Sequence, residues 1–195
     1  MMFMVTLTGC ISLLPEAGPA PEYVSLNPDL PTNKASKHNF QIIIEEPTAD
    51  ILHNSNKIVV LNCQQYKFAE GKEWSERLPI FVQRDIVKAI SKKGLLGVGI
   101  PANGLKPNYI LLSNISKFLV ATKDHDHPKV LIEADFSLMQ IPSRKIVARK
   151  HFSGSEVSAK GFGNILKGFN VVYENMLDEV SDWVIVTSQP SLRGA

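Results

Sequence analysis

The heptapeptide Ile132-Glu133-Ala134-Asp135-Phe136-Ser137-Leu138 alternates apolar and polar side chains at every position. Successive side chains of a β-strand point to opposite faces, so a period of two predicts a strand with one buried face and one wet face. A chain organised around such strands is expected to bury one side of a sheet under helices. Further strands and helices are therefore expected on either side of the heptapeptide.

Two polar connections flank this strand. Ile141-Pro142-Ser143-Arg144 predicts a turn from the strand at residues 130–140 into a strand at 145–153, whose apolar residues include Ile146 and Phe152. The stretch 123–128, Lys-Asp-His-Asp-His-Pro, similarly follows a predicted strand at 109–121. Three consecutive strands with short polar connections predict an antiparallel meander.

Two segments have the helical period instead. Leu78, Val82, Ile86 and Ile90 recur every four residues, with Pro79 suited to a first helical turn and Gly94 to the position just past the end. A longer apolar stripe begins at residue 162 and comprises Phe162, Ile165, Leu166, Phe169, Val172, Tyr173, Met176, Leu177, Val180 and Trp183. Further strands are expected at 40–46, 57–68 and 95–100. The predicted fold class is α+β, in two layers, with a mostly antiparallel sheet and both amphipathic helices packed on one face.

Composition narrows the function classes. The formal net charge is only +2 over 195 residues, and Lys and Arg are not clustered. Binding of nucleic acid requires clustered Lys and Arg, so no nucleic-acid partner is predicted. No Gly-x-x-x-x-Gly-Lys-Ser/Thr loop occurs, and neither Gly97-Val98-Gly99 nor Gly161-Phe162-Gly163 continues into a nucleotide-binding fingerprint. We therefore predict no cofactor and no catalytic residues.

Leu7-Thr8-Gly9-Cys10 has the pattern at which a bacterial lipoprotein is cleaved and lipidated. Small residues next to the scissile bond admit the peptidase, and Cys10 supplies the thiol that carries the lipid. Residues 1–9 lack the positively charged start of a signal peptide, so they are interpreted as a truncated lipoprotein signal. A frayed apolar N-terminus with a chance cysteine is the alternative.

Residues 10–39 are predicted to be a lipidated cysteine followed by a linker. Pro15, Pro19, Pro21, Pro28 and Pro31 remove backbone donors, so the segment is expected to be extended and solvated. Beyond Cys10 no apolar run approaches the roughly 18 residues that would span a bilayer. One folded domain at 40–186 and a tail at 187–195 complete the predicted organisation.

Cys63 is the other cysteine of the chain. It follows the β-branched run Ile58-Val59-Val60-Leu61-Asn62 inside the strand predicted at 57–68. With Cys10 lipidated it has no partner for an internal disulfide. We expect it to be a small buried hydrophobic residue rather than a nucleophile.

The passage from Tyr66 to Pro79 resembles the ABC-type transport auxiliary lipoprotein family. That family's pattern, Y-x-F-A-E-x-x-x-W-x-E-x-L-P, is matched here by Tyr66, Ala69, Glu70, Trp74, Leu78 and Pro79. Glu22-Tyr23-Val24-Ser25-Leu26 is similar to the opening of family members after their leader. The resemblance runs in order over about residues 22–186, and the Gly- and Asn-rich stretch 94–106 departs from it.

The resemblance implies a non-enzymatic component of a lipid transport system. Its implied partners are an ABC permease, a cytoplasmic ATPase and a substrate-binding protein with a mammalian-cell-entry domain. It also implies attachment by lipid, palmitate among its acyl chains, to the outer membrane with the domain facing the periplasm. Ile11 and Ser12 follow the cysteine in place of the Asp that retains a lipoprotein at the inner membrane under the sorting rule of this family's hosts.

Tyr66 and Trp74 are predicted to contact the partner, because aromatic residues on loops are enriched among interface anchors. The alternative for Trp74 is that it packs over the first helix.

Two other functions stay open. One is a generic outer-membrane assembly or chaperone lipoprotein, whose fold could be the same. The other is a metal-dependent enzyme built on Asp124-His125-Asp126-His127, although a solvated turn explains that cluster more simply.

Overall fold

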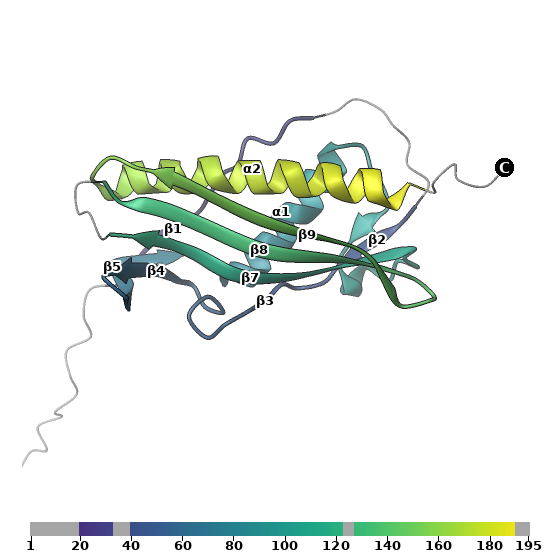
Figure 1. Cartoon of the computed structure of the whole chain (residues 1–195), viewed down its shortest axis with the longest axis horizontal. Coiled ribbons are helices and arrows are strands. Elements are labelled where there is room, and N and C mark those ends of the chain that lie inside the picture. Colours follow the sequence, from purple (N-terminus) through teal and green to yellow (C-terminus); the bar gives the residue numbers. More distant parts are fainter. Residues whose placement is uncertain (1–19, 33–39, 123–126, 190–195) are drawn as a thin grey trace, which may run out of the picture.

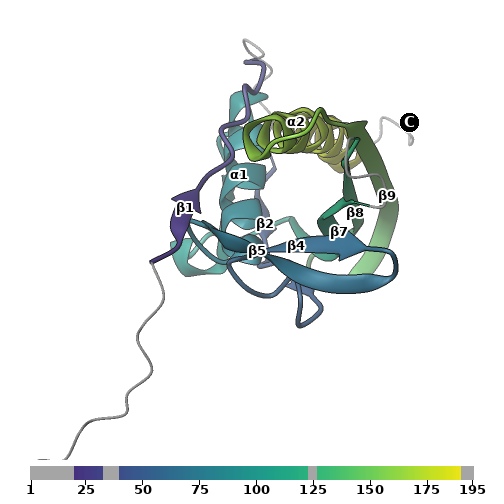
Figure 2. The ribbon, with the colours of Figure 1, turned by 90° about the vertical axis from the view of Figure 1, so that its left-hand side faces the viewer.

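The computed structural model describes residues 20–32, 40–122 and 127–189. Within these residues a curved nine-stranded sheet wraps around two helices, which lie on its inner side (Figures 1 and 2). Both helices contribute to one hydrophobic core with the inner face of the sheet. The predicted two-layer α+β class is therefore confirmed.

The predicted meander forms the long part of the sheet. β7 (Tyr109–Ala121), β8 (Lys129–Gln140) and β9 (Lys145–Val157) pair antiparallel in that order. The apolar residues of the opening heptapeptide are buried on the inner face, with Ile132 and Leu138 at zero exposure. The strand predicted from the period of two is thus confirmed, and β9 runs four residues past its predicted end at 153.

The other edge of β7 is shared by three short strands. β2 (Ile42–Ile44), β3 (Thr48–Ala49) and β4 (Lys57–Asn62) pair with it in parallel, one after another along its length. β6 (Val98–Gly99) pairs with β2, and a 3₁₀ turn at Pro101–Asn103 follows it. β5 (Gln65–Trp74) returns antiparallel to β4. The long ladders are antiparallel as predicted, whereas the short parallel ladders were not anticipated.

α1 (Leu78–Lys92) begins and ends where its sequence signals place it. Pro79 lies in its first turn, and Gly94 follows the cap with a φ of 96°. A positive φ carries no steric penalty for glycine, which suits this position at a helix end. α2 (Phe162–Ser188) continues past the predicted domain end at 186. No helix in the described part of the chain is long and apolar enough to cross a membrane.

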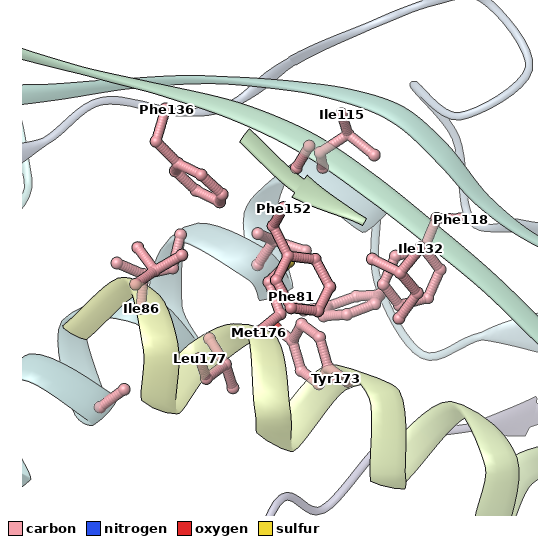
Figure 3. Close-up of a cluster of buried hydrophobic side chains, with 14 of the residues drawn as sticks. Phe81, Ile86, Ile115, Phe118, Ile132, Phe136, Phe152, Tyr173, Met176 and Leu177 are labelled. Carbon is pink, nitrogen blue, oxygen red and sulfur yellow. The ribbon is translucent and has the colours of Figure 1, made fainter. Parts of the chain in front are cut away.

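Aromatic side chains fill the space between α2 and the sheet. Phe118 of β7 stacks on Phe169 of α2 with ring centroids 5.2 Å apart, and it meets Tyr173 edge-on at 5.7 Å. Phe81 of α1 reaches the same cluster (Figure 3). These rings come from three elements distant in sequence, so they join the helices to the sheet.

Residues 20–32 of the predicted linker belong to the fold, which corrects the domain boundary at residue 40. β1 (Glu22–Val24) pairs in parallel with the end of β5, and Leu26 and Leu30 are buried. The backbone N–H groups of Asn27 and Asp29 donate to side chains of α2, Asn170 Oδ1 (3.0 Å) and Glu174 Oε1 (2.9 Å). Prolines exclude a helix here, but an extended segment can still find acceptors on a neighbouring helix.

Candidate docking surface

A tight hairpin replaces the single strand predicted at 57–68. Asn62 of β4 faces Gln65 of β5, and the two residues between them, Cys63 and Gln64, both have positive φ, 46° and 78°. Two-residue hairpin loops with positive φ at both positions match the twist of antiparallel strands. The tertiary structure therefore turns the chain back at a place where no Gly or Pro marks a turn.

The expectation that Cys63 is buried is wrong. Its position in this turn leaves it exposed, with no disulfide. The β-branched run before it does enter the sheet, since Ile58 and Val59 are each 1% exposed. Full burial therefore stops at Val59, because Val60, Leu61 and Asn62 are only half-buried and Cys63 is exposed.

Tyr66 and Phe68 lie two residues apart on β5, so both point away from the core. Tyr66 is opposite Leu61 of β4, and Phe68 is opposite Val59. Leu61 and Val59 alternate along β4 with Ile58 and Val60, whose side chains face the core. Leu61 and Val59 therefore point to the other face of the sheet. The two aromatic side chains therefore stand on the outer face of the sheet.

The same outer face carries further apolar residues across the neighbouring strands. Val59 is in register with Leu119 of β7, and Leu119 with Leu131 of β8. Leu119 is buried and Leu131 is half-buried. We call Leu61, Tyr66, Phe68 and Leu131, together with buried Val59 and Leu119, the outer-face patch.

Exposure in the outer-face patch is concentrated in the two aromatic residues. Tyr66 is 51% and Phe68 45% exposed, while the aliphatic residues beside them are half-buried or buried. Aromatic rings over a packed aliphatic base are typical of binding hot spots, because they offer large apolar area on a rigid support. Sequence reasoning selected Tyr66 and missed Phe68, although the Tyr66-Lys67-Phe68 alternation carried the signal.

Trp74 does not lie on this surface, which corrects its predicted role. It ends β5 and is 1% exposed, with its ring edge-on to Phe81 (5.7 Å) and Phe169 (5.3 Å). A side chain enclosed in this way cannot touch a docked partner. The alternative interpretation, packing against the first helix, describes Trp74 correctly.

A buried polar pair connects the two helices beneath the aromatic cluster. The Tyr173 hydroxyl donates to Asp85 Oδ2 (3.3 Å), and Arg84 Nε and Lys88 Nζ contact Oδ1 of the same carboxylate at 3.1 and 3.3 Å. Burial, reinforced by the Asp85 charge, raises the pKa of Tyr173 well above its usual value. These groups are engaged with one another, and the Tyr173–Asp85 hydrogen bond holds α1 against α2.

Lys93 makes a second link between the helices. Its ammonium lies 2.5 Å from Asp178 Oδ1 and 2.8 Å from Asp182 Oδ1 of α2. Burial alone would lower the pKa of Lys93, but the two carboxylates outweigh it and raise that pKa. The helix pair is thus linked at the middle of α1 by the Tyr173–Asp85 hydrogen bond and just past the C-terminal end of α1 by the ion pairs of Lys93.

Two predicted sites fall outside the described residues. One is the lipidation site, Cys10. The other is the possible metal cluster, of which Asp124, His125 and Asp126 are not described. Across the part of the chain that the structure describes, no three His, Cys, Asp or Glu side chains are grouped so that they could hold a metal ion.

Comparison with known proteins assigns the fold and the family. The family model of the ABC-type transport auxiliary lipoprotein component matches residues 25–181. The crystal structure of protein XCC0632 from Xanthomonas campestris is similar at 18% identity, with a TM-score of 0.77 over 84% of this chain and 94% of that one. A second crystal structure, of an uncharacterized protein, is similar at 15% identity, with a TM-score of 0.67 over 85% and 99% of the two chains.

A comparison with curated proteins found no match. The family match covers most of the chain, and it begins at Ser25, within the segment that the structure adds to the predicted domain. The chain belongs to the family of ABC-type transport auxiliary lipoprotein components.

Proposed function

We propose that this auxiliary lipoprotein is a non-catalytic part of a lipid transport system of the mammalian-cell-entry type. Cys10 carries the lipid that holds it at the outer membrane, and the domain faces the periplasm. There it docks the substrate-binding protein that works with the permease and its ATPase. The family supports the transport role, and the exposed Tyr66–Phe68 pair is the observation that supports docking.

The interior of the domain argues for a docking role rather than a lipid carrier. The space between α2 and the sheet holds the rings of Phe118, Phe169 and Tyr173, each 1% exposed or less. A carrier would need an apolar cavity large enough for acyl chains. Here the two half-exposed aromatic side chains of the outer-face patch lie on the outside of the domain instead.

The energy available from the aromatic pair is sufficient for a hot spot. About half of each side chain is exposed, which corresponds to about 100 Å² per ring. At about 25 cal/mol per Å², complete burial contributes about 2.5 kcal/mol for each ring. Ordering costs reduce this gain, so truncating both rings should weaken docking by about 30-fold to 1000-fold.

The test measures the affinity of the full chain for the mammalian-cell-entry protein that is encoded beside it. A Tyr66→Ser/Phe68→Ser variant should keep its circular dichroism spectrum, since both side chains are half exposed, and lose affinity by at least about 30-fold. Tyr23→Ser is the matched control, because Tyr23 is 61% exposed on β1, beside the far end of β5. Affinity unchanged in the double variant, or reduced equally in Tyr23→Ser, would reject docking at the outer-face patch.

The anchor is tested separately. A Cys10→Ala protein should leave the outer-membrane fraction for the soluble periplasmic fraction, while its purified domain still binds the partner protein. Multiple acyl chains hold a protein at a membrane essentially irreversibly, whereas a domain without them has no comparable attachment. Retention of Cys10→Ala in the membrane fraction, with the transport partners deleted, would show that Cys10 is not the anchor.

A further inference from the structure

A second surface, on the opposite edge of the sheet from β5, has the form of a strand-binding groove. Among the described residues β9 pairs only with β8, so its other edge faces no strand. α2 runs beside β9 (Figures 1 and 2). An open groove of about 590 Å³ lies between them, lined by residues 152–156 of β9 and by one side of α2 from Val171 to Asp182.

The floor of this groove is a close contact between strand and helix. A Cβ atom at Gly154 would lie 2.7 Å from Cγ1 of Val172, so only glycine lets α2 approach the strand backbone here. Lys150 Nζ pairs with Glu179 Oε1 across the groove at 2.6 Å. α2 is therefore held close to the inner face of β9 beside the groove.

The edge of β9 is protected along only one half of its length. Lys145, Arg149 and Lys150 stand in the first half, where positive charges discourage pairing with another strand. The second half, Phe152-Ser153-Gly154-Ser155-Glu156, has no Lys, Arg or Pro. The half that lies in the groove thus keeps its edge open.

The groove is negatively charged. Its lining includes four carboxylates, those of Glu156, Asp178, Glu179 and Asp182. Lys93 neutralises part of the Asp178 and Asp182 charge from the side of α1, and Lys150 pairs with Glu179. Two lysines against four carboxylates leave an excess of two negative charges, and Glu156 forms no ion pair with any described residue.

We infer that this groove binds an extended, lysine- or arginine-bearing segment of a partner protein, which adds to β9 as a further strand beside residues 152–156. Backbone hydrogen bonds to the open edge supply affinity, as in other strand-addition sites that combine a strand edge with a helix. The carboxylates of α2 and Glu156 select basic side chains on the added segment. The site is separate from the outer-face patch and uses none of its residues.

A capped peptide of alternating valine and lysine is a suitable probe for the full chain. It should bind with an affinity that falls as salt is raised, whereas the same peptide with glutamate for lysine should not bind. Glu156→Lys should weaken binding by about fivefold or more, because it places a positive charge beside the added strand. Glu70→Lys, an exposed glutamate on β5, is the matched control and should leave affinity unchanged.

Two further measurements separate strand addition from simple charge attraction. A fully N-methylated peptide keeps its lysines but cannot donate to a strand edge, so it should lose binding. Amide hydrogen exchange should slow within residues 152–157 when the unmodified peptide is added. Equal binding of the methylated peptide, equal effects of Glu156→Lys and Glu70→Lys, protection elsewhere in the chain, or no binding of the lysine peptide would each overturn the inference.

Failure here is distinguishable from failure of the proposed docking function. The Tyr66→Ser/Phe68→Ser variant should bind the lysine peptide as the unmodified protein does, since the aromatic pair lies on β5 and the groove on β9. Loss of peptide binding in that variant would place the peptide on the outer-face patch and overturn the groove as its site.

Discussion

Replacing Trp74 by alanine should destabilise the domain severely without acting on a binding surface. The side chain is 1% exposed and meets three rings edge-on, those of Phe81, Phe118 and Phe169, at centroid distances of 5.7, 5.8 and 5.3 Å. Truncation of a buried tryptophan to alanine costs about 3–5 kcal/mol, because apolar contact is lost and a cavity remains. That is a large share of the roughly 5–15 kcal/mol that stabilises a typical domain.

Trp74→Phe should cost less, about 1–2 kcal/mol. Phenylalanine keeps a ring in the cluster and removes the indole N–H, which is buried with no hydrogen-bond acceptor among the described residues. The smaller ring leaves part of the space unfilled, so some loss remains. The order of stability is therefore wild type, Trp74→Phe, Trp74→Ala.

Urea unfolding followed by far-ultraviolet circular dichroism measures these differences. Trp183→Phe is the control, because Trp183 is only half-buried on α2 and should cost less than about 1 kcal/mol. With Trp183 replaced, Trp74 is the only tryptophan left, and acrylamide should barely quench its fluorescence. Strong quenching, or a cost below about 1 kcal/mol for Trp74→Ala, would refute the burial argument.

Three further predictions concern stability. Tyr173→Phe should cost about 1–2 kcal/mol at neutral pH by removing the hydrogen bond to Asp85. Because the pKa of Tyr173 is raised in the folded protein, the unfolded chain releases the hydroxyl proton at lower pH. The free energy of unfolding of the wild type should therefore fall as pH rises above about 10, by up to about 1.4 kcal/mol per pH unit. It should fall more steeply than that of Tyr173→Phe, which has no such proton. Urea titrations at several alkaline pH values measure this, and parallel curves would contradict it. Gln64→Gly should stabilise the hairpin by about 0.5–1 kcal/mol in thermal unfolding, because glycine adopts the φ of 78° without strain; a lowered melting temperature would count against that reasoning. Gly154→Ala should cost about 1–3 kcal/mol, because its Cβ would press on Val172, and a neutral effect would show that α2 can move away from β9.

Most regular elements could be predicted from local patterns. The period of two in β8 and the apolar stripe of α2 each repeat over many residues, so one interrupted position does not change the prediction. Pro79 and Gly94 marked the limits of α1 because their backbone preferences act within a single turn.

Short or interrupted elements could not be predicted in the same way. β1 spans three residues between prolines, and its pairing partner lies 50 positions away, Glu22 opposite Lys72. The turn at Cys63 and Gln64 uses residues with no preference for positive φ, so the long antiparallel pairing of β4 with β5 imposes that conformation.

The two aromatic residues chosen as anchors show the same division. Tyr66 and Trp74 are both aromatic residues of the passage that resembles the family, so the sequence does not distinguish their environments. In the structure Tyr66 is 51% exposed and Trp74 is 1% exposed. Which of them is buried depends on Phe81 and Phe169, brought over the end of β5 by α1 and α2. Nothing within the passage itself encodes that covering.

The sequence alone was sufficient to determine the helices, the meander, the α+β class and the family resemblance, because periodicity and short motifs act locally. The tertiary structure alone decided where the domain begins, which aromatic residues face outward, and that α2 lies beside the open edge of β9. Exposure is a property of what packs over a residue, and in this fold the packing residues come from distant parts of the chain.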